Sequence, residues 1–449
     1  MLRVFLFICV VLMFCQVSNS QNILPYKVGA YYFGGWHQNF YGGLKLSTAY
    51  EPNQKEMPSY GSSADFWAGP RHIYNNSAWF YEKIPNMLSS NYRKSFRPLL
   101  GYYDLLDQRV MDTHIKMAAS RGLSFFAFYF TPNSLGKQTE ASSVAINSFI
   151  ASQNKYGMKI CLSLELIENP NCTSWLNYRD TLVREVAKYI LNQTQTSIDT
   201  NYLTLQFDST VQPVLVDAMS PWINFCNNPS YHHEFIAHLK DYIYTRTGKE
   251  LYILMRTPSQ LETECNISAY YNIFHNANNR NYKIVDGFTS LIGNQGIQPY
   301  DASINGLFNY DSLAARSYQG SLKWNSNLTE VGSSGSFNNN ILRFYNNTCN
   351  NSTIKIPYVP SIATGYDIRP WGHPSNQGWF TNNTPTGFNY FLKSSKNYLD
   401  FIHQNITTIP SPFKPIDKML LIYAWNEWGE SGILEPSEAN EYKYLDAIS

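Results

Sequence analysis

Residues 423–431 read Tyr-Ala-Trp-Asn-Glu-Trp-Gly-Glu-Ser, the most unusual grouping of functional side chains in the chain. Cleavage of a glycosidic bond needs two carboxyl groups, one that protonates the leaving oxygen and one that acts as nucleophile or base toward an oxocarbenium-like centre. Glu427 and Glu430 supply such a pair. The indoles of Trp425 and Trp428 would lower the local dielectric and keep a neighbouring acid protonated near neutrality. The alternative is a surface turn with two solvated glutamates, which the flanking tryptophans disfavour.

The glutamate pair follows the last of eight short apolar runs that alternate with amphipathic stretches. Most runs are rich in β-branched or aromatic residues, as expected of strands buried on both faces. They cover residues 28–33, 123–130, 158–166, 213–218, 251–256, 284–290, 356–362 and 419–425. Apolar residues at spacings of three and four predict helices over 107–121, 177–191, 231–245 and 386–403, and Gly122, Gly157 and Gly248 end such stretches.

Eight strands that alternate with helices predict an α/β fold, a single (β/α)8 TIM barrel with long βα loops. An insertion over residues 34–100 separates the first strand from the first clear helix. A doubly wound α/β sheet is the alternative, but it usually carries a Gly-rich phosphate turn after its first strand. Residues 32–36 (Tyr-Phe-Gly-Gly-Trp) lack that spacing.

In such a barrel the functional side chains lie just past the carboxyl ends of the strands, on one face. Aromatic rings there would stack on sugars, and carboxylates and amides would bind hydroxyl groups. The predicted substrate-binding residues are Tyr31, Tyr32, Trp36, Tyr129, Glu168, Asp367, Arg369, Trp425, Asn426 and Trp428. Other polar residues have ordinary interpretations: Asp104 as a helix cap, and His37 and His114 as common polar positions.

Composition limits the classes of ligand. The 34 Lys and Arg nearly balance the 33 Asp and Glu, which excludes a general polyanion binder and argues against a nucleic-acid partner. Aromatic residues make up 16 %, which suits stacking on sugar rings or reflects a compositional bias. No Cys-x-x-Cys or His-x-x-x-His spacing indicates a metal site, and no cofactor is predicted.

The first 20 residues have the pattern of a secretory signal peptide. An apolar stretch over residues 4–15 follows Arg3, and Ser18 and Ser20 precede an expected cleavage before Gln21. An uncleaved anchor is the minor alternative, because 12 apolar residues fall short of the ~20 that span a bilayer. The mature protein, residues 21–449, is therefore expected to be a secreted monomeric catalytic domain without a membrane span.

Sequons and cysteines agree with export. Ten Asn-x-Ser/Thr sequons predict N-glycosylation, at Asn75, Asn171, Asn192, Asn266, Asn327, Asn346, Asn350, Asn351, Asn382 and Asn405. Five cysteines remain after cleavage, so at least one is free or intermolecular. Cys161 lies in an apolar run and is the candidate for a buried thiol. The other four, Cys172, Cys226, Cys265 and Cys349, allow two disulfides in any of three pairings.

Several segments together resemble the WbsX-like proteins related to glycoside hydrolase family 99. They are residues 101–105 (Gly-Tyr-Tyr-Asp-Leu), 125–129 (Phe-Phe-Ala-Phe-Tyr), 365–370 (Gly-Tyr-Asp-Ile-Arg-Pro), 426–430 (Asn-Glu-Trp-Gly-Glu) and 434–436 (Leu-Glu-Pro). The similarity extends in order over most of residues 26–448. It implies a single barrel that acts on glycans, as the retaining endo-α-mannosidases of family 99 do.

The resemblance also implies a role for each glutamate. Glu427 would deprotonate the 2-hydroxyl of the sugar, which attacks its own anomeric carbon to form a 1,2-anhydro intermediate. Glu430 would be the general acid and then the base. Gly429 and Ser431, and Tyr366 and Ile368 in the strand-seven segment, depart from the family pattern and leave the substrate open.

Two rival functions remain at this point. WbsX-like proteins are named as glycosyltransferases, although this chain has no nucleotide-phosphate loop and no Asp-x-Asp motif. A barrel that binds glycans without cleaving them is the other rival, and such a protein would have no need for an acid/base pair.

Overall fold

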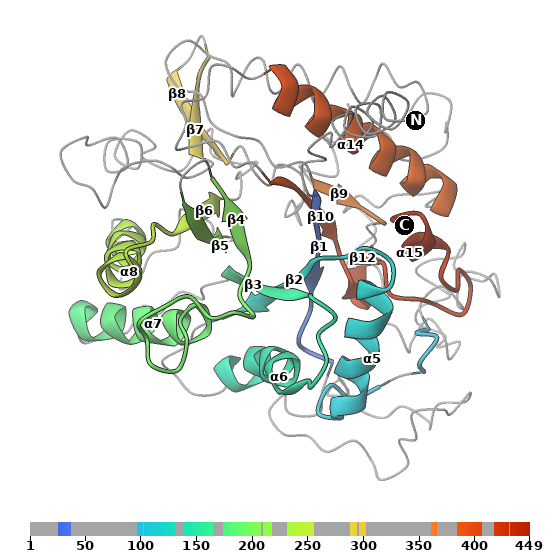
Figure 1. Ribbon diagram of the computed structural model, residues 1–449, viewed down its shortest axis with the longest axis horizontal. Helices are drawn as coiled ribbons and strands as arrows, with labels where there is room; N and C mark the ends of the chain where they lie inside the picture. The colour runs from blue at the N-terminus through green and yellow to red at the C-terminus, as the bar shows by residue number, and fades with distance from the viewer. Residues whose placement is uncertain are drawn as a thin grey trace, which may run out of the picture.

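The computed structural model describes residues 26–36, 97–101, 103–131, 138–164, 174–207, 210–217, 231–255, 288–293, 296–301, 361–365, 384–405, 417–430 and 432–449. A mixed α/β fold is built on a parallel sheet (Figure 1). Its parallel strands are β1 (Tyr26–Tyr32), β2 (Phe125–Phe130), β3 (Lys159–Leu164), β5 (Val211–Asp217), β6 (Tyr252–Met255), β9 (Ser361–Ala363) and β10 (Lys418–Tyr423). The short strand β4 (Thr204–Gln206) runs antiparallel to β5. The apolar runs therefore overlap all seven parallel strands, although only residues 361 and 362 of the run at 356–362 lie in β9, and no run predicted β4.

The strand order is that of a sheet wound in one direction. Across the sheet the parallel strands follow the order β6-β5-β3-β2-β1-β10-β9, so β1 has both β2 and β10 as neighbours. In a doubly wound sheet the numbering would rise outward on both sides of the first strand. Here the strand numbers fall from β6 to β1, and the next neighbours, β10 and β9, come from the carboxyl-terminal part of the chain. This order argues against the doubly wound alternative.

A long-range hydrogen bond shows that the sheet curls. The backbone N–H of Gln206, at the end of β4, donates to the Asp417 carboxylate 2.8 Å away, just before β10. Four strand-to-strand steps separate β5, the partner of β4, from β10. In a flat sheet these steps would span about 19 Å at ~4.8 Å each. The two sides of the sheet must therefore bend toward each other at this end.

Helices lie around the outside of the strands (Figure 1). They are α5 (Gln108–Ala119), α6 (Gln138–Ala151), α7 (Trp175–Ile190), α8 (Tyr231–Thr247), α14 (Pro385–Asn405) and the short α15 (Lys443–Asp446). All but α6 and α15 were predicted. In α5 the buried residues Met111, His114, Ile115 and Ala118 repeat at intervals of three and four, and Gly122 follows the helix with φ +89°. The left-handed conformation at Gly122 ends the helix at little steric cost.

The sixth predicted strand has a different partner from the expected one. Residues 288–290 do form part of a strand, β7 (Phe288–Gly293), but it pairs antiparallel with β8 (Gly296–Asp301) in a separate two-stranded sheet. Only two residues separate β7 from β8, a connection length that favours a hairpin. Among the described residues no strand joins β6 to β9.

The prediction of a buried thiol at Cys161 is confirmed. Cys161 lies in β3 as a free, fully buried cysteine, and burial raises the pKa of its thiol. The remaining cysteines, and the segment 1–20, lie outside the described residues. Within the part of the chain that the structure describes, no helix has the length and apolar character needed to cross a bilayer.

Asp400 of α14 ties this helix to β1 and β10. Its carboxylate accepts hydrogen bonds from Lys396 Nζ at 2.8 Å, from Lys418 Nζ at 2.6 Å and from the Tyr26 hydroxyl. Partial burial acts to raise the pKa of Asp400, but these hydrogen bonds outweigh it and hold the pKa at about 2. Because the folded value lies below that of an unfolded aspartate, the stabilisation is complete above about pH 4 and is lost as the pH falls toward 2.

We therefore expect Asp400→Asn to lower the free energy of unfolding by about 1 kcal/mol at pH 7, after allowance for solvent screening. Urea denaturation at pH 7 and pH 3 measures the effect, and the gap between variant and wild type should shrink at the lower pH. Asp446→Asn, at the exposed pair with Arg121, is the control and should change stability little. An equal gap at both pH values would contradict the assignment.

Candidate active site

The two glutamates lie in a tight hairpin that follows β10. The hairpin consists of β11 (Asn426–Glu427), the 3-10 helix η5 (Trp428–Glu430) and β12 (Gly432–Ile433), with Glu427 opposite Gly432. Glu427 is buried, at 4 % exposure, and the backbone of Glu430 follows one helical turn later. The side chain of Glu430 lies outside the described part of the structure. Both residues therefore lie at the carboxyl end of the last parallel strand, as predicted.

Close packing against β10 fixes the hairpin. A Cβ atom on Gly432 would come within 2.5 Å of the Tyr423 ring and 3.2 Å of the Ala424 nitrogen. Leu434 N also donates to Ala424 O at 2.8 Å, and Glu435 N donates to Trp425 O at 2.7 Å. Only glycine at position 432 lets β12 approach the strand this closely.

Asn426 joins the hairpin to the segment after β1. Its Oδ1 accepts from Phe33 N at 2.8 Å, and its Nδ2 donates to Phe33 O at 3.0 Å. The Asn426 carbonyl accepts from Trp36 Nε1 at 2.7 Å. These bonds place the backbone just before Glu427 in a fixed position relative to β1.

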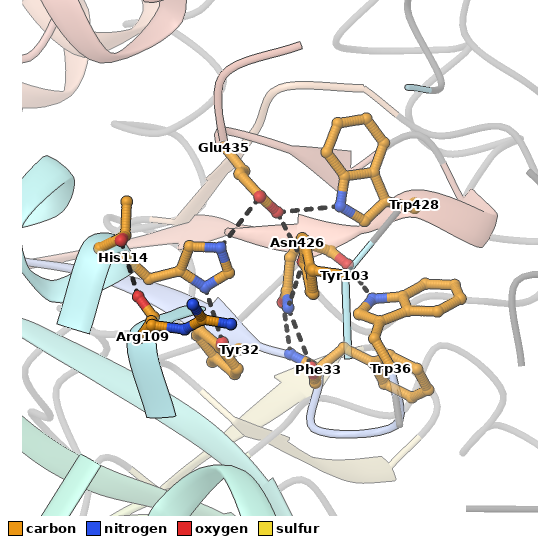
Figure 2. A network of polar contacts seen from close by, with 10 residues as sticks. Tyr32, Phe33, Trp36, Tyr103, Arg109, His114, Asn426, Trp428 and Glu435 are labelled. Carbon is orange, nitrogen blue, oxygen red and sulfur yellow. Dashed lines mark hydrogen bonds and ion pairs between the residues drawn. The ribbon is translucent and has the colours of Figure 1, made fainter. Parts of the chain in front are cut away.

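Glu435, at the far end of the hairpin, is the centre of a buried polar network (Figure 2). Its Oε2 accepts from the Tyr103 hydroxyl at 2.7 Å and from Trp428 Nε1 at 2.9 Å. Its Oε1 lies 3.0 Å from His114 Nε2, and His114 Nδ1 lies 2.8 Å from the Tyr32 hydroxyl. The network joins β1, the segment before α5, α5 itself and the hairpin.

Burial determines the protonation of the two phenols in this network. Desolvation, and then the charge of Glu435, raises the pKa of Tyr32 and of Tyr103 well above the usual value. Both phenols therefore keep their protons and can donate. One consistent arrangement has Tyr32 donating to His114 Nδ1, with His114 Nε2–H and the Tyr103 hydroxyl donating to the Glu435 carboxylate.

The predicted aromatic residues lie on two faces of the sheet. Tyr32 faces the helices, since it contacts His114 of α5, and successive side chains of a strand point to opposite faces. Tyr31 therefore points to the inner face, where it stacks on Tyr129 with ring centroids 5.9 Å apart. Phe33 meets Tyr129 edge-on at 6.3 Å. These rings, near the carboxyl ends of β1 and β2, form an aromatic cluster on the inner face, in which Tyr31 and Tyr129 are buried and Phe33 is partly exposed.

Other predicted substrate-binding residues are occupied within the protein. Trp425 is fully buried and packs on His114 and Phe126 at 5.5 and 5.1 Å. Trp36, Asn426 and Trp428 use the polar groups described above to join the hairpin to its neighbours. Glu168, Asp367 and Arg369 lie outside the described residues. Direct contact between substrate and any of the predicted residues stays a prediction.

Three members of the network were not predicted as site residues: His114, Tyr103 and Glu435. His114 was interpreted as an ordinary polar position, which is wrong, because it is fully buried in the network. The signal for it was a histidine on the apolar face of α5.

Asp104 was expected to cap this helix, but the N-cap is Asp107, and Asp104 instead accepts from Leu106 N in the preceding turn. Among the described residues no group of three or more acidic, His or Cys side chains is placed to hold a metal ion.

Comparisons with known proteins identify solved structures of similar fold and a matching family. A solved structure titled "Glycoside hydrolase-like protein" is similar with a TM-score of 0.51 and 13 % identity, over 94 % of this chain and 93 % of that chain. The GH99 endo-alpha-mannosidase from Bacteroides thetaiotaomicron has a TM-score of 0.43 and 12 % identity, over 94 % of this chain and 95 % of that one. No curated protein matches the chain. The family model described as Glycosyltransferase WbsX matches residues 187–448, more than half of the chain, and the chain therefore belongs to the WbsX family.

Proposed function

We propose that this protein is a retaining glycoside hydrolase that cleaves mannose-type or related glycans with Glu427 and Glu430. The observation that carries the proposal is the position of both glutamates in a buried, anchored hairpin at the carboxyl end of the last parallel strand. Catalytic groups of (β/α)8 enzymes occupy this position. The fold shared with a glycoside hydrolase-like protein agrees with it.

We extend the parallel sheet to a closed (β/α)8 barrel in this proposal. Its support is the one-directional strand order and the hydrogen bond between Gln206 and Asp417 that the curled sheet allows. Closure would bring the aromatic cluster of Tyr31, Phe33 and Tyr129 to the inside of the mouth. There the partly exposed ring of Phe33 could stack on a sugar beside the hairpin.

The proposed reaction proceeds in two steps. Glu427 removes the proton from the sugar 2-hydroxyl as O2 attacks the anomeric carbon, and Glu430 gives a proton to the departing glycosidic oxygen. Water then opens the 1,2-anhydro sugar: Glu430 takes the proton of the water, and O2 regains its proton from Glu427. Two inversions at the anomeric carbon give net retention. Anchoring by Asn426 would hold Glu427 in place for the first proton transfer.

We place the mature protein, residues 21–449, as a single secreted catalytic domain. The loop at Asn192 is consistent with glycosylation, because Thr194 Oγ1 donates to Asn192 Oδ1 at 3.2 Å within a turn at the surface. Secretion, the glycans, the disulfides and the monomeric state belong to the proposal.

A glycosyltransferase is the second candidate, because the family description itself names that activity. The two candidates differ in what they require. A transferase needs an activated sugar donor, whereas a hydrolase needs only glycan and water.

Incubation of the secreted protein with α-mannan and high-mannose glycans tests the proposal. We expect oligosaccharide release without any donor, and a first product with retained anomeric configuration by proton NMR. Product formation only with a nucleotide-sugar donor would support the transferase. Binding without any product would contradict both the hydrolase and the transferase activity and would favour a glycan-binding barrel.

A further inference from the structure

We propose that Glu435 is a positioning residue that acts through the indole of Trp428 to hold the turn carrying Glu427 and Glu430 in its reactive geometry. The inference rests on the proposed function, because it assigns a role in that reaction to a residue outside the glutamate pair. It concerns a carboxylate whose oxygens contact the protein rather than the substrate.

The first argument is the burial of the Glu435 carboxylate. Its side chain is fully buried, and so is that of His114, whose Nε2 lies 3.0 Å from Glu435 Oε1. Burying a carboxylate is unfavourable unless hydrogen bonds compensate the loss of hydration. Three donors from three segments, Tyr103, His114 and Trp428, converge on its two oxygens (Figure 2). An apolar side chain would avoid this cost but would leave these three buried donors without an acceptor.

The second argument is which of the three donors can transmit an effect. Tyr103 and His114 come from the segment before α5 and from α5 itself, which do not carry the glutamate pair. Trp428 is the first residue of η5 and lies directly between Glu427 and Glu430 in the chain. Its bond to Glu435, seven residues later, spans the hairpin outside the β11–β12 pairing. The indole therefore joins the network to the residues between Glu427 and Glu430, while a 3.4 Å bond from Asn426 Nδ2 to the Tyr103 hydroxyl joins it to the residue before Glu427.

The third argument is that Glu435 is itself held in place. Its backbone N–H donates to Trp425 O at 2.7 Å, so its position is set by the end of β10. The turn is then held from two directions, by Asn426 before Glu427 and by Glu435 through Trp428. Displacement of a reacting group by about 1 Å can lower a rate about 100-fold. Loss of the Glu435–Trp428 bond should therefore affect turnover more than binding.

The test is a double-mutant cycle with Glu435→Gln and Trp428→Phe. We expect each single variant to lower kcat by about 10- to 100-fold with KM changed less than about 3-fold. The double variant should lose no more than the worse single variant, because both remove one interaction. Losses that multiply in the double variant would overturn the proposal. Glu438→Gln, which removes a carboxylate near Arg97 in the same segment, is the matched control and should leave kcat unchanged.

A readout that needs no substrate separates this inference from the proposed function. The Nε1–H proton of Trp428, assigned by its loss in Trp428→Phe, should resonate downfield in the wild-type protein and move upfield in Glu435→Gln. If the wild-type protein hydrolyses no glycan but this shift occurs, the proposed function fails while the bond stands. An unchanged resonance in a folded Glu435→Gln variant would overturn the positioning role, as would a proportional loss of folded protein that explains the whole fall in kcat.

Discussion

Glu430→Gln should lower kcat on a natural mannan by about 10³-fold, within the range that general acid–base catalysis supplies. Glutamine cannot give a proton to the leaving oxygen, but it keeps the shape of the side chain, so glycan binding should survive. Steady-state kinetics and a separate binding measurement with the same glycan check both parts. Full activity in this variant would contradict the assignment of the acid.

A substrate with a good leaving group distinguishes the two glutamates. Fluoride leaves a glycosyl fluoride without protonation, so Glu430→Gln should regain activity in the first step with this substrate. Glu427→Gln should remain inactive, because it cannot deprotonate the 2-hydroxyl. Equal rescue of both variants would contradict the separate roles.

The wild-type profile of kcat/KM against pH should be bell-shaped, with both limbs belonging to the coupled pair. A monotonic profile would count against a mechanism with two carboxyl groups.

Gly29→Ala should cause the largest loss of stability among single methyl additions in the described strands. A Cβ atom on Gly29 would lie 2.1 Å from two atoms of the Phe125 ring and 2.4 Å from a third. Phe125 is fully buried on the neighbouring strand β2, so the ring cannot move into solvent. We expect the free energy of unfolding to fall by about 2–4 kcal/mol, measured by urea denaturation.

Two further variants test the cause. Gly157→Ala adds the same methyl group where nothing lies within 4 Å, and its φ of +84° should cost only about 1–2 kcal/mol. Phe125→Leu in the Gly29→Ala background should recover part of the loss, because the smaller side chain leaves room for the methyl group. Additive losses in that double variant would show that the steric contact is not the cause.

The framework of the fold followed from apolar runs, because strands buried on both faces need continuous apolar sequence. Within the run at 123–130, residues 125–130 form β2, and every one of them is buried. The sixth strand shows where this reasoning ends: an apolar run reports burial and not its partner, and residues 288–293 pair with β8 instead.

The candidate site also has a part that the sequence predicts and a part that it does not. Carboxylate pairing and position predicted Glu427 and Glu430, because the chemistry restricts the residue types. Asn426 and Trp36 have side chains that suit sugars. In the structure, however, the Asn426 side chain bonds to Phe33, and the Trp36 indole bonds to the Asn426 carbonyl. Which partner a polar group meets depends on contacts across more than 300 residues, and no local pattern encodes it. His114 and Glu435, 321 residues apart, were missed for this reason.

The pairing of β1 with β10 has a consequence for synthesis. Phe33 and Asn426, which join the ends of these strands, are 393 residues apart. At ~5–20 residues per second, a ribosome needs about 20–80 s to make the chain between them. Through that interval one edge of β1 lacks its native neighbour, and an unpaired strand edge invites pairing with other chains. The hairpin that carries Glu427 and Glu430 therefore forms among the last contacts of the nascent protein, and until then this edge of β1 is open to pairing with other chains.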